Sequence, residues 1–166
     1  MPLNQQDKKT IIEKVNKICH SALSVVIVEF KNISVNTITK LRKEALKNDV
    51  YIHIIRNTLL KIAFNKTEFE CLNTVLKGSI LVAFSMKHPG SAMRILQVYE
   101  KEFNNLKIVN VAFEGKLLEK QEILQLALMP THLEAVSRFI FTIQEAAIGK
   151  LIRLLHSIRN KKEKNK

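Results

Sequence analysis

The sequence predicts an α+β protein: a ferredoxin-like, four-stranded and largely antiparallel sheet with flanking and inserted helices, followed by a long C-terminal helical extension. Three observations predict it. Short β-branched runs alternate with helically spaced apolar residues, these segments follow the order helix, β-α-β, inserted helices, β-α-β, and a long apolar and basic segment follows Pro130. Two consecutive β-α-β units are typical of the ferredoxin-like fold. A doubly wound parallel sheet has the same element order and stays open as an alternative.

The first part of the chain contains the first two expected strands and the helix between them. Residues 4–20 space their apolar side chains as a helix does, and residues 23–30 (LSVVIVEF) are a β-branched run that predicts a buried strand. Ser34 is a suitable N-cap for a helix that turns Leu41 inward. The apolar run at residues 50–55 then predicts the second strand.

The rest of the domain repeats this alternation. We expect helices at residues 57–65, 68–75 and 119–128, and strands at residues 79–84 and 107–114. His88-Pro89-Gly90 marks the start of one more helix, between the third and fourth strands. The apolar contacts expected for that helix are Met93, Leu96, Val98 and Phe103.

Pro130 marks the expected domain boundary, with domains at residues 1–130 and 131–166. Residues 132–160 predict one nearly continuous helix of about 29 residues, roughly 43 Å long at about 1.5 Å per residue. That length exceeds the diameter expected for the preceding domain, so the helix cannot pack on it entirely. Gly149 lies in mid-helix, where glycine costs about 1 kcal/mol relative to alanine, and it indicates a hinge or a segment break.

The charge balance indicates a polyanionic partner. The chain has 27 Lys and Arg against 15 Asp and Glu, a net charge of +12, and about half of this excess lies in residues 150–166. Net charge informs about partners and not about fold. Nucleic acid is the first candidate partner, and an anionic membrane surface or an acidic protein comes next. Two separate basic regions with different roles are therefore expected.

Residue patterns that would indicate an enzyme or a metal protein are missing from the sequence. The four glycines form no phosphate-binding loop, the five histidines have no metal-ligand spacing, and the serines have no nucleophile-elbow context. Cys19 and Cys71 lie far apart and are expected to be buried thiols in a reducing compartment. No signal peptide or membrane span is recognisable. We expect a cytoplasmic protein without catalytic residues, cofactor or metal.

The junction at Ile55-Arg56-Asn57 is the strongest local signal for a ligand. A strand is expected to end at Ile55 and a helix to begin near Asn57, which places Arg56 beside the N–H groups of a helix N-terminus. A guanidinium there suits a phosphate of an RNA backbone. Lys31, Arg42 and Lys43 are expected on the same side. The alternative, in which Asn57 is an ordinary N-cap and Arg56 a solvent-exposed charge, stays open.

The C-terminal helix carries a broad apolar stripe. Val136, Ile140, Ile143, Ala147, Leu151, Leu154 and Ile158 recur at a mean spacing of about 3.67 residues, which matches a straight or slightly right-handed helix. Phe139, Phe141, Ile148, Ile152 and Leu155 widen this stripe. A helix that is apolar around much of its circumference is normally buried. Acidic partner proteins are the expected cover. Packing on the chain's own domain would cover it only in part, and its breadth and the lack of Trp argue against a membrane-surface helix.

Several motifs together resemble the bacterial ribosomal protein L-ten family. The resemblance runs nearly end to end and rests on Leu41-Arg42-Lys43, Arg56-Asn57-Thr58-Leu59-Leu60, Phe69-Glu70-Cys71-Leu72, His88-Pro89-Gly90, Ala112-Phe113-Glu114-Gly115 and Gly149-Lys150-Leu151. It implies a structural constituent of the large ribosomal subunit, at the base of the ribosomal stalk. In this family the N-terminal domain binds large-subunit rRNA beside ribosomal protein L-eleven. The C-terminal helix carries dimers of the acidic protein L-seven/L-twelve, which recruit GTP-bound translation factors.

The resemblance also implies site residues. The rRNA-binding candidates are Lys8, Lys31, Arg42, Lys43, Arg56, Asn57 and Lys61. The stalk-dimer-binding candidates are Phe139, Ile140, Ile143, Ala147, Leu151, Leu154, Leu155 and Ile158. The short C-terminal segment implies two dimers. The family's usual Arg-Gly is Lys31-Asn32 here and its usual Pro is Ser79, and Lys31 lacks the bidentate geometry of arginine. An alternative function for the same basic face is that of a free-standing RNA-binding translational regulator.

Overall fold

The computed structural model describes residues 5–65, 67–103 and 105–164. Its elements in chain order are α1 (Gln5–Ser21), β1 (Ser24–Phe30), α2 (Val35–Lys47), β2 (Val50–Ile54), α3 (Asn57–Phe64), the 3₁₀ helix η1 (Glu70–Thr74), β3 (Ile80–Ser85), α4 (Ser91–Glu102), β4 (Leu106–Phe113), β5 (Lys116–Leu117), α5 (Lys120–Leu128), α6 (His132–Gln144), the π-helical turn η2 (Glu145–Gly149) and α7 (Lys150–Lys164). Contacts divide this chain into two compact units, Met1–Met129 and Pro130–Lys166.

The sheet is antiparallel throughout its described pairings, which confirms the α+β class and rules out the doubly wound parallel alternative. Its strand order is β2-β3-β1-β4-β5. β1 pairs with β3 and with β4, and β2 pairs with β3, all antiparallel. The first four strands therefore have the ferredoxin-like arrangement that the element order predicts.

The short strand β5 is absent from the sequence-based prediction of four strands. It pairs with the end of β4 through a two-residue turn, in which both Glu114 (φ 49°) and Gly115 (φ 74°) have positive φ. Such turns suit the twist of a hairpin and are usually signalled by Asn-Gly or Asp-Gly. The sequence Glu-Gly is a weaker signal, and a two-residue strand has no periodicity of its own.

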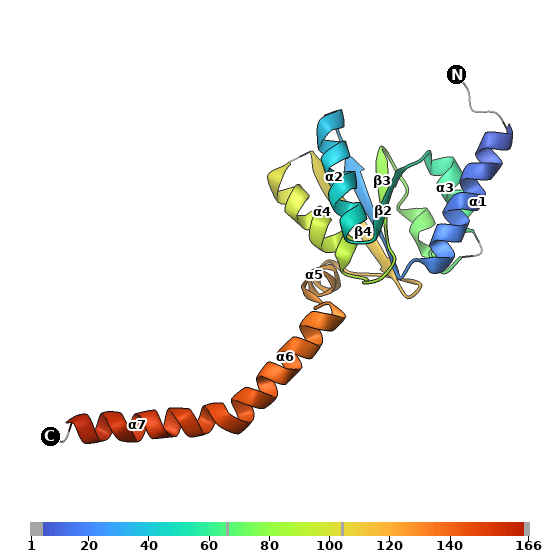
Figure 1. The fold of residues 1–166 in the computed structure, drawn as a ribbon. Helices are drawn as coiled ribbons and strands as arrows, with labels where there is room; N and C mark the ends of the chain where they lie inside the picture. The colour runs from blue at the N-terminus through green and yellow to red at the C-terminus, as the bar shows by residue number, and fades with distance from the viewer. Residues whose placement is uncertain (1–4, 66, 104, 165–166) are drawn as a thin grey trace. The chain divides into compact units, whose positions relative to one another are not determined.

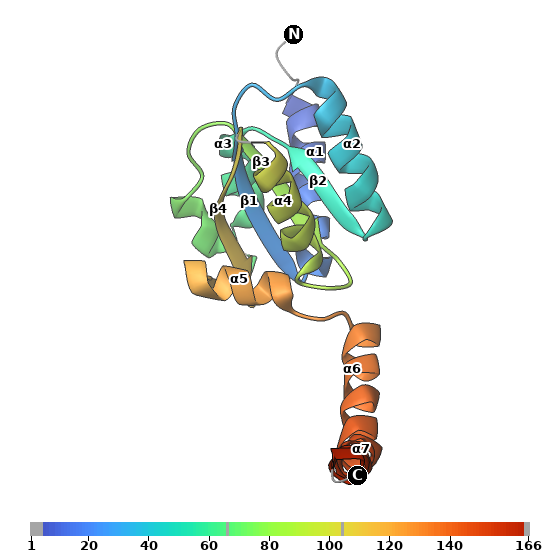
Figure 2. The ribbon, with the colours of Figure 1, turned by 90° about the vertical axis from the view of Figure 1, so that its left-hand side faces the viewer.

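Helices cover both faces of the sheet (Figures 1 and 2). α2, α4 and α5 pack on one face, where their apolar side chains meet Val26 and Val28 of β1. α1, α3 and η1 pack on the other face, against Val25 and Ile27. Successive residues of a strand point to opposite faces. Because an apolar core covers each face, β1 is buried from Ser24 to Val28, and both sets of its alternating side chains from Val25 to Val28 are β-branched.

Two helix predictions need correction. Val98 was expected to be an apolar contact of α4, but it is 55% exposed, and Phe103 is 38% exposed beyond the end of that helix. Helical spacing from Met93 and Leu96 leads to Tyr99, which is buried and stacks on Phe103. The helix predicted at residues 68–75 is a shorter 3₁₀ helix, η1.

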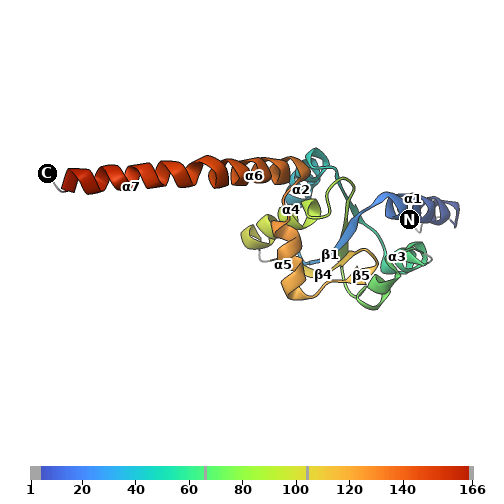
Figure 3. The same cartoon turned by 90° about the horizontal axis from the view of Figure 1, so that it is seen from below.

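The C-terminal unit remains helical from His132 to Lys164 (Figure 3). Thr131 and Glu134 form a capping box that starts α6: each side chain accepts a hydrogen bond from the other's backbone N–H. The segment break that the sequence indicates at Gly149 is present: α6 ends at Gln144, the π-helical turn η2 ends at Gly149, and α7 begins at Lys150. A wider turn suits the two successive spacings of four residues from Ile143 to Ala147 to Leu151.

We expect Leu41→Ala in α2 to reduce the free energy of unfolding by about 2–5 kcal/mol, because it leaves a cavity in the core. Leu41 is 2% exposed. Leu46 of the same helix is 59% exposed, and Leu46→Ala is the matched control, with an expected change within about 0.5 kcal/mol. Chemical denaturation followed by circular dichroism measures both values. Equal losses in the two variants would contradict the assigned core.

Candidate nucleic-acid interface

The junction of β2 and α3 places Arg56 where the sequence predicts it. Arg56 is the N-cap residue of α3, in an extended backbone conformation, and its exposed side chain makes no capping hydrogen bond. The possible N-cap named in the prediction, Asn57, is instead the first residue of the helix. Its side-chain amide donates a 3.0 Å hydrogen bond to the carbonyl of Gly78. Asn57 therefore ties α3 to the turn that precedes β3.

The antiparallel topology brings four chain segments to this end of the sheet. β1 and β2 end there, while β3 and β4 begin there. The backbone N–H of Phe30 donates to the carbonyl of Ser79 at 3.1 Å, and the N–H of Lys31 donates to the carbonyl of Asn105 at 3.0 Å. These bonds fix the loops around Arg56 relative to one another.

An open groove of about 520 Å³ lies between these loops. Its apolar walls include Phe30, Ile54 and Ile80. Its polar walls come from Arg56, Asn57, Thr58 and Ser79. Sequence reasoning identified Arg56 and Asn57 but missed the apolar part of the groove, because Phe30 and Ile80 become neighbours only through strand pairing.

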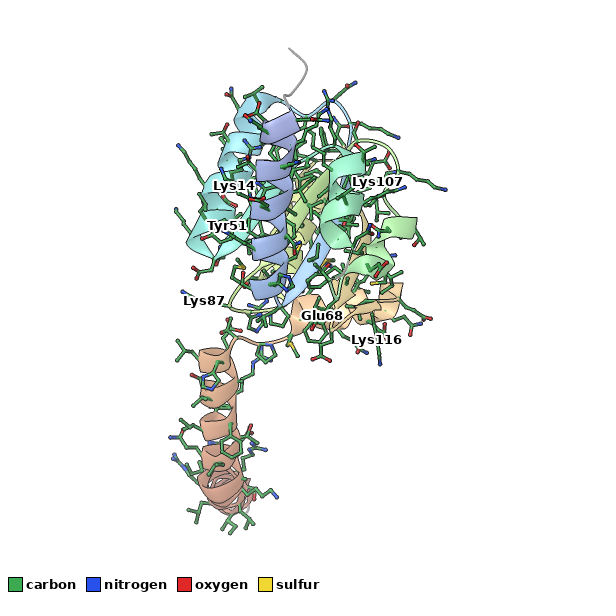
Figure 4. The ribbon with its side chains drawn as sticks, turned by 90° about the vertical axis from the view of Figure 1, so that its right-hand side faces the viewer. Lys14, Tyr51, Glu68, Lys87, Lys107 and Lys116 are labelled. Carbon is green, nitrogen blue, oxygen red and sulfur yellow. The ribbon has the colours of Figure 1, made fainter. Side chains whose placement is uncertain are left out.

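A second, smaller hollow of about 180 Å³ adjoins the end of β1 and is lined by Glu29, Lys31, Asn105 and Lys107. The Lys31 ammonium lies 3.2 Å from a carboxylate oxygen of Glu29. Glu29 and Lys107 are cross-strand partners of β1 and β4. Figure 4 shows Lys107 at the end of the sheet opposite to that of Lys87 and Lys116. Lys107 is thus a further basic residue at this end of the sheet, and only the strand register reveals its position.

The remaining predicted RNA contacts lie on helices, outside the lining of these two hollows. Arg42 and Lys43 are exposed in the middle of α2. Lys61 is exposed on α3, and Lys8 is half-buried on α1, the helix that packs on α3. The structure thus places Lys31, Arg56 and Asn57 at one end of the sheet and leaves Lys8, Arg42, Lys43 and Lys61 on the helices α1, α2 and α3.

Arg42 also influences the edge strand β2. Burial of the imidazole is the larger cause that lowers the pKa of His53 below 6.5, and the positive charge of Arg42 lowers it further. The His53 ring lies 6.3 Å from the Phe84 ring, between centroids. The charge of Arg42 on α2 therefore acts on a group of the edge strand β2.

The C-terminal helix exposes its apolar stripe. Within the described side chains of α6, none is buried. The exposed fractions of the predicted partner-binding residues are 66% for Phe139, 50% for Ile140, 51% for Ile143, 60% for Leu154, 63% for Leu155 and 46% for Ile158. The side chains of Ala147 and Leu151 lie outside the described ones. Large apolar side chains in such a row normally meet a partner.

An ion pair spans the π-helical turn between α6 and α7. The guanidinium of Arg153 donates a hydrogen bond to the carboxylate of Glu145. Gly149 lies between the two residues: a Cβ placed there would come within 3.1 Å of Cγ of Glu145 and 3.7 Å of Nη2 of Arg153. The glycine that the sequence indicated as a hinge therefore leaves space for this ion pair.

The described residues hold no cluster of three or more His, Cys, Asp or Glu that could bind a metal ion. Over those same residues, no helix is both long and apolar enough to cross a membrane. Cys19 is buried, and this burial raises the pKa of its thiol to about 12. Cys71 is only half-buried, contrary to the prediction of two buried thiols, and its pKa is also raised by burial.

A basic α+β domain with an exposed cationic edge and an uncovered apolar helix has the features of a structural protein of a ribonucleoprotein. Comparison with known proteins identifies the protein family to which the chain belongs. Residues 3–101 match the family model described as Ribosomal protein L10. The chain is 45% identical to the large ribosomal subunit protein uL10 of Buchnera aphidicola subsp. Cinara cedri (strain Cc), over 97% of this chain and 100% of that protein. It is 48% identical to the protein of the same name from Wigglesworthia glossinidia brevipalpis, over 96% of this chain and 99% of the other.

The chain belongs to the ribosomal protein L-ten family. It is therefore a structural protein of the large ribosomal subunit that takes part in translation, and not an enzyme.

We expect Arg42→Gln to raise the pKa of His53 towards 6.5, because one of the two causes of its depression is removed. The unfolded chain binds more protons than the native one between the two pKa values, so His53 reduces stability as the pH falls through 6.5. The variant should lessen this loss. Titration of the imidazole by NMR measures the shift. Lys43→Gln, beside Arg42 on α2, is the control, and an equal shift in both variants would contradict the specific role of Arg42.

Proposed function

We propose that this protein forms the base of the ribosomal stalk in the bacterial cytoplasm. Its N-terminal unit binds large-subunit rRNA beside ribosomal protein L-eleven. Its C-terminal helix carries dimers of the acidic protein L-seven/L-twelve, which bring GTP-bound translation factors to the ribosome. The family implies this division of work, and the separation of the chain into two units supports it.

The observation that carries the proposal is the uncovered C-terminal helix. Its described large apolar side chains are 43–80% exposed along α6 and α7. A row of such residues binds by laying the helix against apolar surfaces of a partner. About half of the excess positive charge of the chain lies in the same region. Acidic partners complement that charge, which accelerates their association and favours them over basic competitors.

The two helical stretches suit two partner dimers. α6 has 13 residues and α7 has 15, and the π-helical turn η2 separates them. One dimer would contact Phe139, Ile140 and Ile143, with Ala147 at the boundary. The second would contact Leu151, Leu154, Leu155 and Ile158.

The rRNA surface is proposed around the edge where the loops after β1 and β2 meet. Arg56 is its centre, because its guanidinium is exposed and makes no capping bond. Lys31 and Asn57 adjoin it, while Lys8, Arg42, Lys43 and Lys61 supply further cations on α1, α2 and α3. Asn57 is the weakest direct contact of this set, because its amide is already bonded to Gly78. Cosedimentation of the chain with large subunits in moderate salt would favour this function over a free-standing regulator.

Arg56→Ala should weaken binding to large-subunit rRNA and make the slope of log affinity against log salt shallower by about one charge. The reason is the loss of one phosphate contact and of the counterion release that accompanies it. Filter binding across a salt series measures the slope. Lys116→Ala, at the opposite end of the sheet, is the control and should leave the slope nearly unchanged. An unchanged slope in Arg56→Ala would mean that Arg56 does not contact phosphate.

Leu154→Asp should remove one partner dimer from the complex, because it buries an unpaired charge in the interface. Ser157→Asp introduces the same charge on the same helix outside the proposed contact residues and serves as its control. Native mass spectrometry of the complex with L-seven/L-twelve measures the stoichiometry, expected to fall from two dimers to one in the first variant only.

Removal of all residues after Pro130 tests the division between the two units. The remaining domain should bind rRNA as the full chain does and should no longer capture the acidic protein. Capture by the truncated chain would contradict the proposed role of the helix.

A further inference from the structure

We propose that the groove between Phe30, Ile54 and Arg56 binds one unpaired nucleotide base of RNA. This inference rests on the proposed rRNA function and deepens it, because it concerns how the RNA is held and not only where. The groove has about 520 Å³ of space, within the range of about 300–1,000 Å³ that is common for small-molecule sites.

The lining of the groove suits an unpaired base better than the sugar-phosphate backbone of an RNA helix. Its walls include Phe30, which is half-buried against the core, and Ile54, which is 39% exposed. A regular RNA helix offers phosphates and 2′-hydroxyls to a protein and has nothing to place against such apolar walls. An unpaired base has two flat apolar faces, and aromatic side chains or arginine planes are the usual surfaces on which it stacks.

Polar side chains share the lining of the groove with the apolar walls. Arg56, Thr58 and Ser79 line the same groove, and they can meet the hydrogen-bonding edge of a base or its sugar and phosphate. Lys31 follows Phe30 directly, and its side chain is 78% exposed. Cationic side chains beside apolar walls complement a nucleotide, whose charge lies on its phosphate and not on its base.

Two hydrogen bonds hold the walls in place before any ligand binds. The amide of Asn57 donates to the carbonyl of Gly78 at 3.0 Å, and the N–H of Phe30 donates to the carbonyl of Ser79 at 3.1 Å. They join the loop after β2, the start of β3 and the end of β1. A site that is already ordered loses little conformational freedom on binding, which favours affinity.

The test uses the full chain and deproteinised large-subunit rRNA as the probe. Phe30→Ala should weaken binding by about 5- to 150-fold, the effect expected for one lost base stack. The slope of affinity against salt should stay unchanged, in contrast to Arg56→Ala. Ile54→Ala should act in the same direction and more weakly. Ile54 lies outside both apolar cores. Ile54→Ala therefore keeps the test valid if a thermal melt shows that Phe30→Ala does not fold.

Tyr51→Ala is the matched control for Ile54→Ala. Tyr51 is 43% exposed on the same strand and does not line the groove. It should bind rRNA as the wild type does. Ultraviolet cross-linking of the wild-type complex, followed by peptide mass spectrometry, should locate a nucleotide on Phe30 or on residues 54–58.

Three outcomes would overturn the inference, and each has a different consequence for the proposed rRNA function. Wild-type binding with unaffected groove variants and no adduct would reject the base site and leave the rRNA function intact. Absence of wild-type binding to rRNA would reject both. Groove variants that retain rRNA affinity but lose binding to L-eleven would show that the groove takes a protein segment.

Discussion

The antiparallel pairing of β1 with β3 on one side and β4 on the other is the constraint on which the rest of the structure depends. It places β1 in the interior of the sheet, with a separate apolar core on each face. A shift of one residue in this register would exchange the side chains of the two cores. The register therefore selects which residues of β1 face α2 and α4, and which face α1 and α3.

The same pairing creates the candidate nucleic-acid edge. Because neighbouring strands run in opposite directions, the ends of β1 and β2 meet the beginnings of β3 and β4. Phe30, Arg56 and Gly78 thus become neighbours although more than twenty residues separate each from the next in the chain. The hydrogen bond from Asn57 to Gly78 then fixes this edge. Rigid strands hold the loops, and the loops carry the groups that suit RNA, an arrangement common to many binding sites.

The C-terminal helix depends on a different balance. No sheet or second helix covers its described side chains within its own unit, so helix propensity, the Thr131 capping box and local ion pairs must stabilise it alone. Such local contributions are small, and most helices in proteins rely on the packing of an apolar face. Partner dimers would supply that packing. The ion pair of Glu145 with Arg153, beside Gly149, joins the start of the π-helical turn η2 to α7.

Local sequence patterns were enough to predict the order of the elements, most of their bounds, the exposed apolar helix, the position of Arg56 at a strand end and the division of positive charge. Periodicity and capping are properties of neighbouring residues, so one chain suffices to read them. Other features became visible only in the folded chain: the strand order, the short hairpin at Glu114-Gly115, the burial of Tyr99 in place of Val98, and the position of Phe30 and Ile54 in one groove. Register is a non-local property that no single segment encodes. The cationic edge was therefore foreseen through Arg56, and the groove beside it was not.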